Sequence, residues 1–200
     1  MKINYQILCD KRIGEIIRQG KRPTLLLHSC CGPCSTYVLE YLSEHFDITL
    51  LFHNPNIFPE EEYLKRLETQ LEVLEKSTSS ASVKIIDLPY NHDEFLHSSK
   101  GFEGEPEGGL RCVECFRLRM ETAARIAKEK SFDFFTTTLS VSPHKNAMIL
   151  NELGKELSEK YGVEYLYSDF KKREGYKRSI ELSKEYGLYR QEYCGCEFSL

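Results

Sequence analysis

The sequence has no long hydrophobic run, and this absence excludes several classes of protein. No stretch approaches the roughly 20 apolar residues of a membrane-spanning helix. The first residues, Met-Lys-Ile-Asn-Tyr-Gln, contain no hydrophobic region of the kind found in signal peptides. We therefore expect a cytoplasmic protein without a membrane partner, in which the cysteines have a role other than structural disulfides.

Internal repeats, long low-complexity tracts and an excess of positive charge are also lacking. The formal net charge of −4 gives no overall attraction to nucleic acid, although a total can conceal local basic patches. The 200 residues, 40% hydrophobic and 12% aromatic, exclude a disordered chain. We expect a single α/β domain over residues 1–200.

Short apolar runs alternate with helical patterns along the chain. The runs that we predict as strands are residues 25–27, 48–52, 83–88, 132–136 and 165–167. Apolar residues at helical spacing predict helices around residues 13–18, after Pro33, over 60–76, after Cys115, and around Leu150, Leu153 and Leu157. This alternation predicts a three-layer α/β/α fold with a mainly parallel sheet and a site at the carboxyl ends of its strands.

The chain is organised around residues 25–35, where an apolar run ends in three cysteines: Cys30, Cys31 and Cys34. Gly32 permits a sharp turn and Pro33 suits a first helical turn, so we expect these thiols where a strand passes into a helix. Free N–H groups and the helix dipole stabilise a thiolate there, which is the form that binds metal or attacks. The group indicates a metal or redox site, whereas the isolated Cys9 is interpreted as a packing residue.

Two further cysteine pairs follow, Cys112 with Cys115 at a predicted helix start and Cys194 with Cys196 near the C-terminus. In a doubly wound sheet the helix-start groups can meet at one edge, and the C-terminal segment can fold back to join them. One tetrahedral zinc takes four ligands and leaves three of the seven thiols unexplained. A [4Fe–4S] cluster also takes four, and its separate irons let adjacent cysteines both serve. The thiols that we assign to a cluster are Cys30, Cys31, Cys112 and Cys115.

Cys34, Cys194 and Cys196 are then left beside the cluster as candidate catalytic thiols, and two arrangements remain open. A disulfide between Cys194 and Cys196 would close a very small, strained and easily reduced ring, which suits a redox couple. Alternatively, the three thiols hold a second metal with a carboxylate or water. Either arrangement places one-electron and two-electron chemistry side by side.

Three other segments are candidates for contact with a substrate. The glycine-rich residues 101–109 form either a mobile segment that closes over the site or a plain surface loop. The hydroxyl-rich turn at 137–146 suits phosphate binding or ordinary helix capping. Residues 171–200 carry basic side chains that contact nucleic-acid phosphates or form a solvated helix face: Lys171, Lys172, Arg173, Lys177, Arg178 and Arg190.

These motifs resemble the QueH family of epoxyqueuosine reductases, the type that does not use cobalamin. The resemblance covers residues 25–200 and rests on segments 28–34, 54–59, 105–115, 137–143 and 189–196. It implies reduction of epoxyqueuosine to queuosine at the wobble position of tRNA, the last step of that modification. It also implies a nucleotide α-hydrolase-like (HUP-type) fold, here with a helical C-terminal extension over residues 171–200 that returns the Cys-Gly-Cys motif to the site.

The resemblance also implies roles for individual residues. The residues that match cluster ligands are Cys30, Cys31, Cys112 and Cys115. Cys194 and Cys196 match a redox-active pair, and a further iron at Cys34 would compete with that disulfide for the two tail thiols. The implied partners are tRNA carrying epoxyqueuosine, which the basic residues of 171–200 would contact, and an electron donor that the sequence does not identify.

Three rival functions remain open on the residues alone. A zinc protein would use the cysteines only to hold its fold, and absorption near ~400 nm from iron–thiolate ligation would reject it. An ATP-dependent tRNA-modifying enzyme of the same fold class would bind phosphate at the hydroxyl-rich turn, although cysteines occupy the usual place of a glycine-rich phosphate loop. A general thiol–disulfide protein would work without iron.

Overall fold

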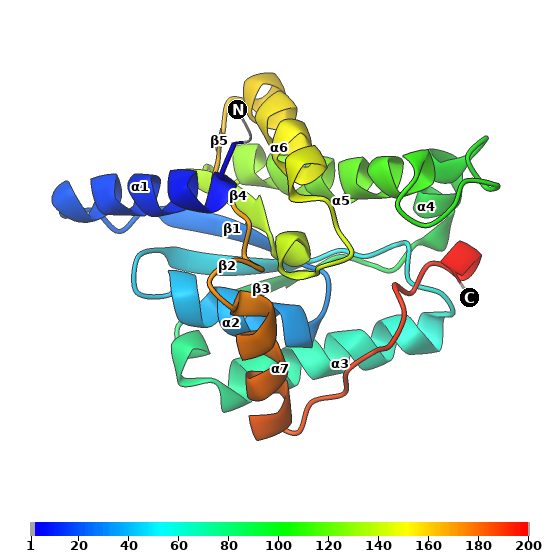
Figure 1. The fold of residues 1–200 in the computed structure, drawn as a ribbon, viewed down its shortest axis with the longest axis horizontal. Helices are drawn as coiled ribbons and strands as arrows, with labels where there is room; N and C mark the ends of the chain where they lie inside the picture. Colours follow the sequence, from blue (N-terminus) through cyan, green and yellow to red (C-terminus); the bar gives the residue numbers. More distant parts are fainter. Residues whose placement is uncertain (1–2, 200) are drawn as a thin grey trace.

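The computed structural model describes residues 3–199 and contains a five-stranded sheet with helices on both faces (Figure 1). All neighbouring strands are parallel, and their order is β3-β2-β1-β4-β5. The strands are β1 (Thr24–Ser29), β2 (Asp47–Phe52), β3 (Lys84–Asp87), β4 (Phe134–Thr137) and β5 (Glu164–Tyr165). The predicted three-layer α/β/α fold with a parallel sheet is therefore confirmed.

Seven α-helices lie in the described part of the chain: α1 (Tyr5–Arg18), α2 (Gly32–Leu42), α3 (Glu60–Lys76), α4 (His92–Ser99), α5 (Leu110–Glu129), α6 (Ala147–Tyr161) and α7 (Gly175–Glu185). The sequence predicted α3 with its observed bounds but missed α4, because this short helix buries a single large apolar side chain, Phe95. Helix α7, which packs on α2, is the predicted C-terminal helix. Within residues 3–199, none of the helices combines the length and the apolarity needed to traverse a bilayer.

Alternating side chains of β1 divide the core between the two faces of the sheet. Leu25 and Leu27 pack with residues of α1, α2 and α3, whereas Leu26 packs with residues of α5 and α6. Because both faces are covered, this strand appears in the sequence as an uninterrupted apolar run. Cys9 is fully buried in the first of these cores, as predicted for a packing residue, and burial raises the pKa of its thiol to about 12.

The order of the strands reverses between β1 and β4, which lie side by side at the centre of the sheet (Figure 1). At such a reversal the segments leaving the carboxyl ends of the two strands diverge, and a crevice forms between them. Cys30 directly follows β1, and Thr138 directly follows β4. The topology therefore places the first cysteine group at the position where open α/β sheets bind ligands.

The first turn of α2 approaches the backbone of α3 closely, and Gly32 makes this approach feasible. A Cβ atom added at Gly32 would lie 2.7 Å from the carbonyl oxygen of Thr69. We expect Gly32→Ala to lower the free energy of unfolding by about 1–3 kcal/mol, as overpacking against a fixed backbone does. Urea denaturation measures the change, and Gly104→Ala is the control because a Cβ there meets nothing within 4 Å. Equal losses in both variants would contradict the close contact.

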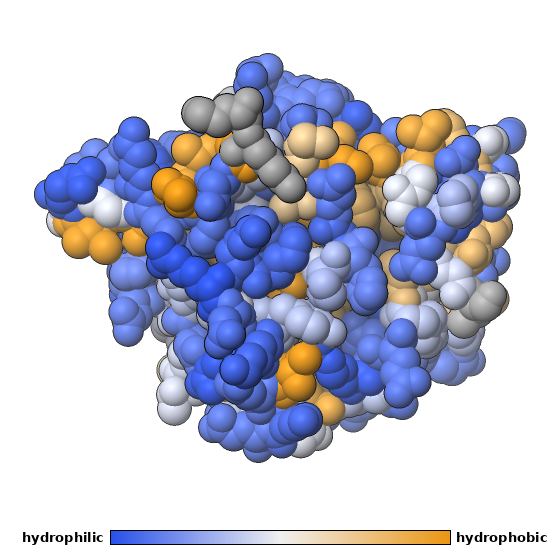
Figure 2. Space-filling view, viewed as in Figure 1, coloured by the Kyte–Doolittle hydropathy of each residue, from blue (hydrophilic) through white to orange (hydrophobic). Residues whose placement is uncertain are grey.

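The molecular surface on the face shown in Figure 2 is mostly hydrophilic, and its apolar patches are small and separate. Large hydrophobic side chains that stay exposed include Ile7 and Ile17 on α1 and Met148 on α6. Scattered exposed apolar residues of this kind are normal for a globular protein. The concentration of chemically active groups lies instead at the carboxyl edge of the sheet.

Candidate metal centre and its cavity

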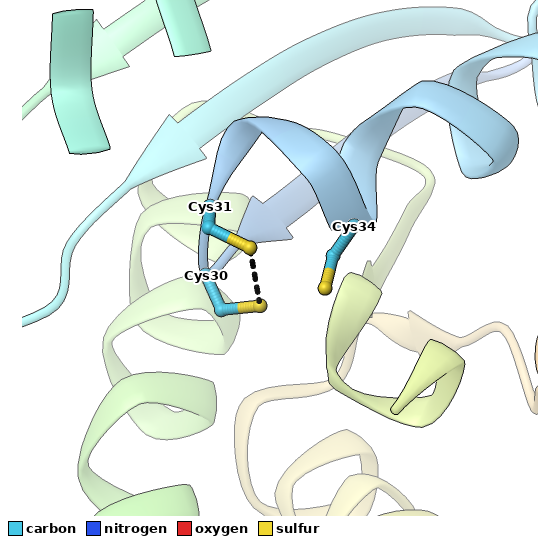
Figure 3. Close-up of side chains that lie close together, drawn as sticks. All are labelled: Cys30, Cys31 and Cys34. Atoms are coloured by element: carbon cyan, nitrogen blue, oxygen red, sulfur yellow. Dashed lines mark hydrogen bonds between the residues drawn. The ribbon is translucent and has the colours of Figure 1, made fainter. Parts of the chain in front are cut away.

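Three thiols lie together at the junction of β1 and α2 (Figure 3). The sulfur atoms of Cys30, Cys31 and Cys34 all lie within 4.8 Å of one another, and those of Cys30 and Cys31 are 3.8 Å apart. Cys31 precedes the first helical residue and Cys34 lies in the first turn, so one sharp bend of the chain brings the three together. Convergent thiols at this spacing form a group that could bind a metal.

Side chains from three other segments hold this bend in place. Ser29 Oγ donates a hydrogen bond to Gln70 Oε1 on α3 at 2.6 Å, and Asn54 Nδ2 donates to the Ser29 carbonyl at 2.9 Å. The Cys30 N–H donates to Thr138 Oγ1, beyond β4, at 3.2 Å. All of these groups except Cys30 are buried. The thiols are therefore presented by a turn that is fixed from several sides.

Hydrogen bonds within the thiol group shift the pKa values of its members in opposite directions. Hydrogen bonding with the thiols of Cys31 and Cys34 lowers the pKa of Cys30 well below its ordinary value. The same contacts raise the pKa of Cys31 to about 11 and that of Cys34 well above its ordinary value. The contacts within the group therefore favour ionisation of Cys30 over that of Cys31 and Cys34.

Cys112 and Cys115 lie one turn apart at the start of α5. Cys112 Sγ accepts a hydrogen bond from the N–H of Gly108 at 3.2 Å. Cys115 is buried, and burial raises the pKa of its thiol to about 12. Within residues 3–199, the group of candidate ligand atoms that lie within 4.8 Å of one another contains neither Cys112 nor Cys115. Their predicted role as cluster ligands stays a prediction.

The C-terminal segment runs back across α3 toward these thiols (Figure 1). Cys194 lines the same cavity as Cys30 and Cys34, whereas Cys196 packs with Cys115 in a small buried cluster. All the cysteines of the chain are free thiols. Thiols from three distant segments are thus gathered at one edge of the sheet.

An ion pair on α3 fixes the path of this segment. Arg66 is 2% exposed, and its Nη1 donates to the carbonyl of Cys194 at 2.9 Å while Nη2 donates to that of Tyr193 at 3.3 Å. Its Nε donates to Glu62 at 2.6 Å, and Glu62 also accepts from the Tyr189 hydroxyl at 3.1 Å. Sequence reasoning missed Arg66, because the two carbonyls that it holds lie more than a hundred positions away.

A cavity of about 790 Å³ opens beside the thiols, within the range of about 300–1,000 Å³ that ligand sites occupy. Cationic and aromatic side chains line much of it, namely Arg66, Arg119, Lys145, Arg190, Tyr176 and Tyr193. Glu107 brings a carboxylate to the wall from the glycine-rich loop. That loop is anchored beneath by the buried Arg111, whose Nη1 donates to the Glu103 carbonyl at 2.8 Å. Whether the loop also moves over the site stays a prediction.

The basic residues that were predicted to contact nucleic acid lie in different environments. Arg190 lines the cavity beside the thiols, and Lys171 and Lys172 line a second cavity that shares Lys145 with the first. Lys171 also pairs with Asp169 at 2.7 Å, and the other three basic residues pair with carboxylates as well: Arg178 with Glu40 at 2.8 Å, Lys177 with Glu174 at 3.4 Å, and Arg173 with Asp10. Lys145, which sequence reasoning passed over, is better placed at the thiols than those three.

The hydroxyl groups at the end of β4 and just after it face the interior. Thr137 Oγ1 lies 2.9 Å from Nδ1 of the buried His28 and also accepts from the Leu139 N–H. Ser140 Oγ lies 3.1 Å from Ser168 Oγ. Both residues are at most 1% exposed. The structure therefore supports the capping alternative for this turn and disfavours a phosphate site on these hydroxyls.

Comparisons of the sequence with known proteins agree on one family. The family profile described as "Epoxyqueuosine reductase QueH" matches residues 25–200. A protein of that name from Staphylococcus epidermidis is 47% identical over 202 residues, covering 99% of this chain and 85% of that protein. The one from Streptococcus pyogenes is 42% identical, with 99% and 78% covered, and the one from Thermotoga maritima is 36% identical, with 88% and 90% covered.

A solved structure with a similar fold is the U34-tRNA thiolase NcsA from Methanococcus maripaludis with its [4Fe-4S] cluster. The likeness has a TM-score of 0.49 at 14% sequence identity and covers 96% of this chain and 68% of that chain.

Proposed function

The chain belongs to the epoxyqueuosine reductase QueH family, and from this premise we propose that it reduces epoxyqueuosine to queuosine at the wobble position of tRNA with an iron–sulfur centre. The observation that carries the proposal is the gathering of thiols from two distant segments around one cavity, where Cys194 lies with Cys30 and Cys34, while Cys115 of the third segment packs with Cys196. A protein that used cysteine only for packing would not line an open cavity with it.

The donor set at this edge suits an iron–sulfur centre. Every candidate ligand is a thiol, and the buried Arg119 brings a compensating positive charge to the anionic sulfurs. The residues that would hold a [4Fe–4S] cluster are Cys30, Cys31, Cys112 and Cys115. Cys34, Cys194 and Cys196 would then act as redox thiols or hold a further iron ion. When bound, the cluster would supply electrons singly to the site.

The proposed reaction has a definite balance of electrons and protons. Converting an epoxide to an alkene breaks two C–O bonds, consumes two electrons and two protons, and releases the oxygen as water. Oxidation of two thiols to a disulfide releases two electrons and two protons, so the Cys194 and Cys196 pair matches that stoichiometry. An external electron donor must then reduce the disulfide before the next turnover.

The cavity walls suit a base that has left the anticodon stack. Enzymes that act on a base in a folded nucleic acid extrude it into a pocket, where it stacks on aromatic groups. Tyr176 and Tyr193 offer such faces, and Lys145 and Arg190 offer positive charge for phosphates. We propose this wall as the contact for the modified nucleotide of tRNA.

Anaerobic reconstitution with iron and sulfide, followed by assay on tRNA containing epoxyqueuosine, tests the proposed function. We expect a brown protein that absorbs near ~400 nm and forms queuosine without added nucleotide. A protein that holds only zinc and forms no queuosine would overturn the proposal. Turnover that requires ATP would favour the ATP-dependent alternative, and turnover in iron-free protein would favour a simple thiol–disulfide mechanism.

Two lysines test where the phosphates of tRNA bind. Lys172 has no ion-pair partner among residues 3–199 and lines the second cavity, whereas Lys177 is paired with Glu174. We expect Lys172→Gln to weaken tRNA binding about three- to tenfold. The slope of the logarithm of the binding constant against the logarithm of the salt concentration should become shallower by about one. Lys177→Gln, which removes the same charge, should change neither quantity appreciably. Equal effects of the two variants, measured by salt titration of binding, would contradict the assignment.

A further inference from the structure

Three arginines in this protein are almost completely buried: Arg66, Arg111 and Arg119 are each 2% exposed. Arg66 is paired with Glu62. No ion pair within residues 3–199 includes Arg111 or Arg119, which lie two turns apart on α5 on either side of Cys115. A guanidinium stays charged at any physiological pH, and a buried charge without a counter-charge strongly destabilises a fold.

Both arginines are only partly satisfied, since Nε of Arg111 and Nη2 of Arg119 are buried without a hydrogen-bond partner in the described chain, but Arg119 alone of the two lines the cavity. Arg111 donates to the carbonyls of Glu103 and Glu105 and lies over the ring of Phe198. Arg119 donates from Nε to the Cys115 carbonyl at 3.1 Å, but its buried Nη2 has no hydrogen-bond partner in the described chain. Arg119 also lines the cavity beside the thiols. An unpartnered donor therefore lies at the wall where a ligand would bind.

Arg119 lies beside residues of all three cysteine segments. It lines the cavity together with Cys30 and Cys194, and it donates to the backbone of Cys115. The buried His28 and His53 are kept neutral by burial and by this same cation, with pKa values lowered to about 3 and about 4. One guanidinium thus lies near a cysteine from each of the three segments that form the site.

We propose that Arg119 is the counter-charge of the iron–sulfur centre, with Nη2 donating a hydrogen bond to one of its sulfurs and the positive charge raising its reduction potential. This inference rests on the proposed function, because it requires a centre that takes up an electron. A one-electron reductant such as dithionite adds one negative charge to the centre and breaks no bond, and a fixed cation favours that reduced form. Arg119 is a positioning residue and need not touch the substrate.

The first test compares the reconstituted wild-type protein with Arg119→Gln at one fixed solution potential. We expect the ratio of reduced to oxidised centre, read by electron paramagnetic resonance, to fall at least about tenfold, which corresponds to 59 mV for one electron. Arg119→Lys keeps the charge and should stay within about threefold of the wild type. The control is Arg117→Gln on the same helix, whose side chain is 32% exposed and paired with Glu156, and it should leave the ratio unchanged. An unchanged ratio in Arg119→Gln with full iron and sulfide content would overturn the proposal.

The second test uses iron-free protein and no turnover. Because Arg119→Met removes a buried charge that lacks a counter-charge, its urea midpoint should be higher than that of iron-free wild-type protein. A lower midpoint would show that the guanidinium already has its partners within the chain, and would overturn the proposal. If Arg119→Gln takes up no iron, uptake by Arg119→Lys supports the counter-charge, whereas loss in both together with a lower midpoint in Arg119→Met contradicts it. A zinc-only protein that forms no queuosine would end the proposed function, while the urea comparison would still decide the role of Arg119.

Discussion

Cys112→Ala is expected to remove the iron–sulfur absorbance and the epoxyqueuosine reductase activity together. Cys112 lies at the start of α5 with its sulfur accepting the Gly108 N–H, a bond that would support a thiolate ligand. Changes outside the ligand set of a metal centre already cost about 10- to 100-fold in affinity or activity, so loss of a ligand should lower turnover by at least about 100-fold. Iron content, absorbance near ~400 nm and queuosine formation measure the result.

Two further variants make this experiment decisive. Cys9→Ala is the matched control, because Cys9 is fully buried in the core over the other face of the sheet and should affect neither iron nor turnover. Cys34→Ala separates the two ligand sets, since Cys34 is the third member of the compact thiol group. With the cluster on Cys30, Cys31, Cys112 and Cys115, Cys34→Ala retains the absorbance. Loss of the cluster in Cys34→Ala and its retention in Cys112→Ala would show that Cys34, and not Cys112, is the fourth ligand.

Features set by neighbouring residues were predictable from the sequence. The apolar run that became β1, the glycine and proline after it, and the helical spacing beyond them placed Cys30, Cys31 and Cys34 at a strand-to-helix junction, where the structure has them. The parallel sheet followed from the alternation of strand and helix patterns. Helix α4 was missed because eight residues with one large buried apolar side chain give too weak a periodic signal.

Features set by distant pairing were not predictable. Arg178 was taken as a phosphate contact, but it forms a bidentate pair with Glu40, 138 positions away. Arg66 lies within a charged helical segment that looks solvated in the sequence, yet it is buried because the C-terminal segment covers it. Arg119 was overlooked because its burial and its place in the cavity wall depend on segments that are distant in the sequence. Charge counted along a chain cannot distinguish a free cation from a neutralised one. The contact that we propose for tRNA therefore lies at the cavity wall and not on α7.

The contribution of the C-terminal segment is best tested by Cys194→Ser. Arg66 holds this segment through the carbonyls of Tyr193 and Cys194. The substitution leaves these hydrogen bonds intact and changes only a side chain that lines the cavity. Serine cannot form a disulfide and is a poor iron ligand. We expect most of the iron–sulfur absorbance to remain while turnover falls by at least about 1,000-fold, equivalent to about 4 kcal/mol on the barrier.

Thiol counts and iron content of the wild type and of these cysteine variants distinguish the two arrangements of Cys194 and Cys196. If Cys194 and Cys196 cycle as a disulfide, wild-type protein that has turned over once without an electron donor should contain two fewer titratable thiols per chain, and Cys196→Ser should be as inactive as Cys194→Ser. If they hold a further iron ion with Cys34, the thiol count stays constant and each of the three variants loses one iron relative to the wild type. Turnover in Cys194→Ser at half the wild-type rate or more would exclude both arrangements, because either one requires that sulfur in every cycle.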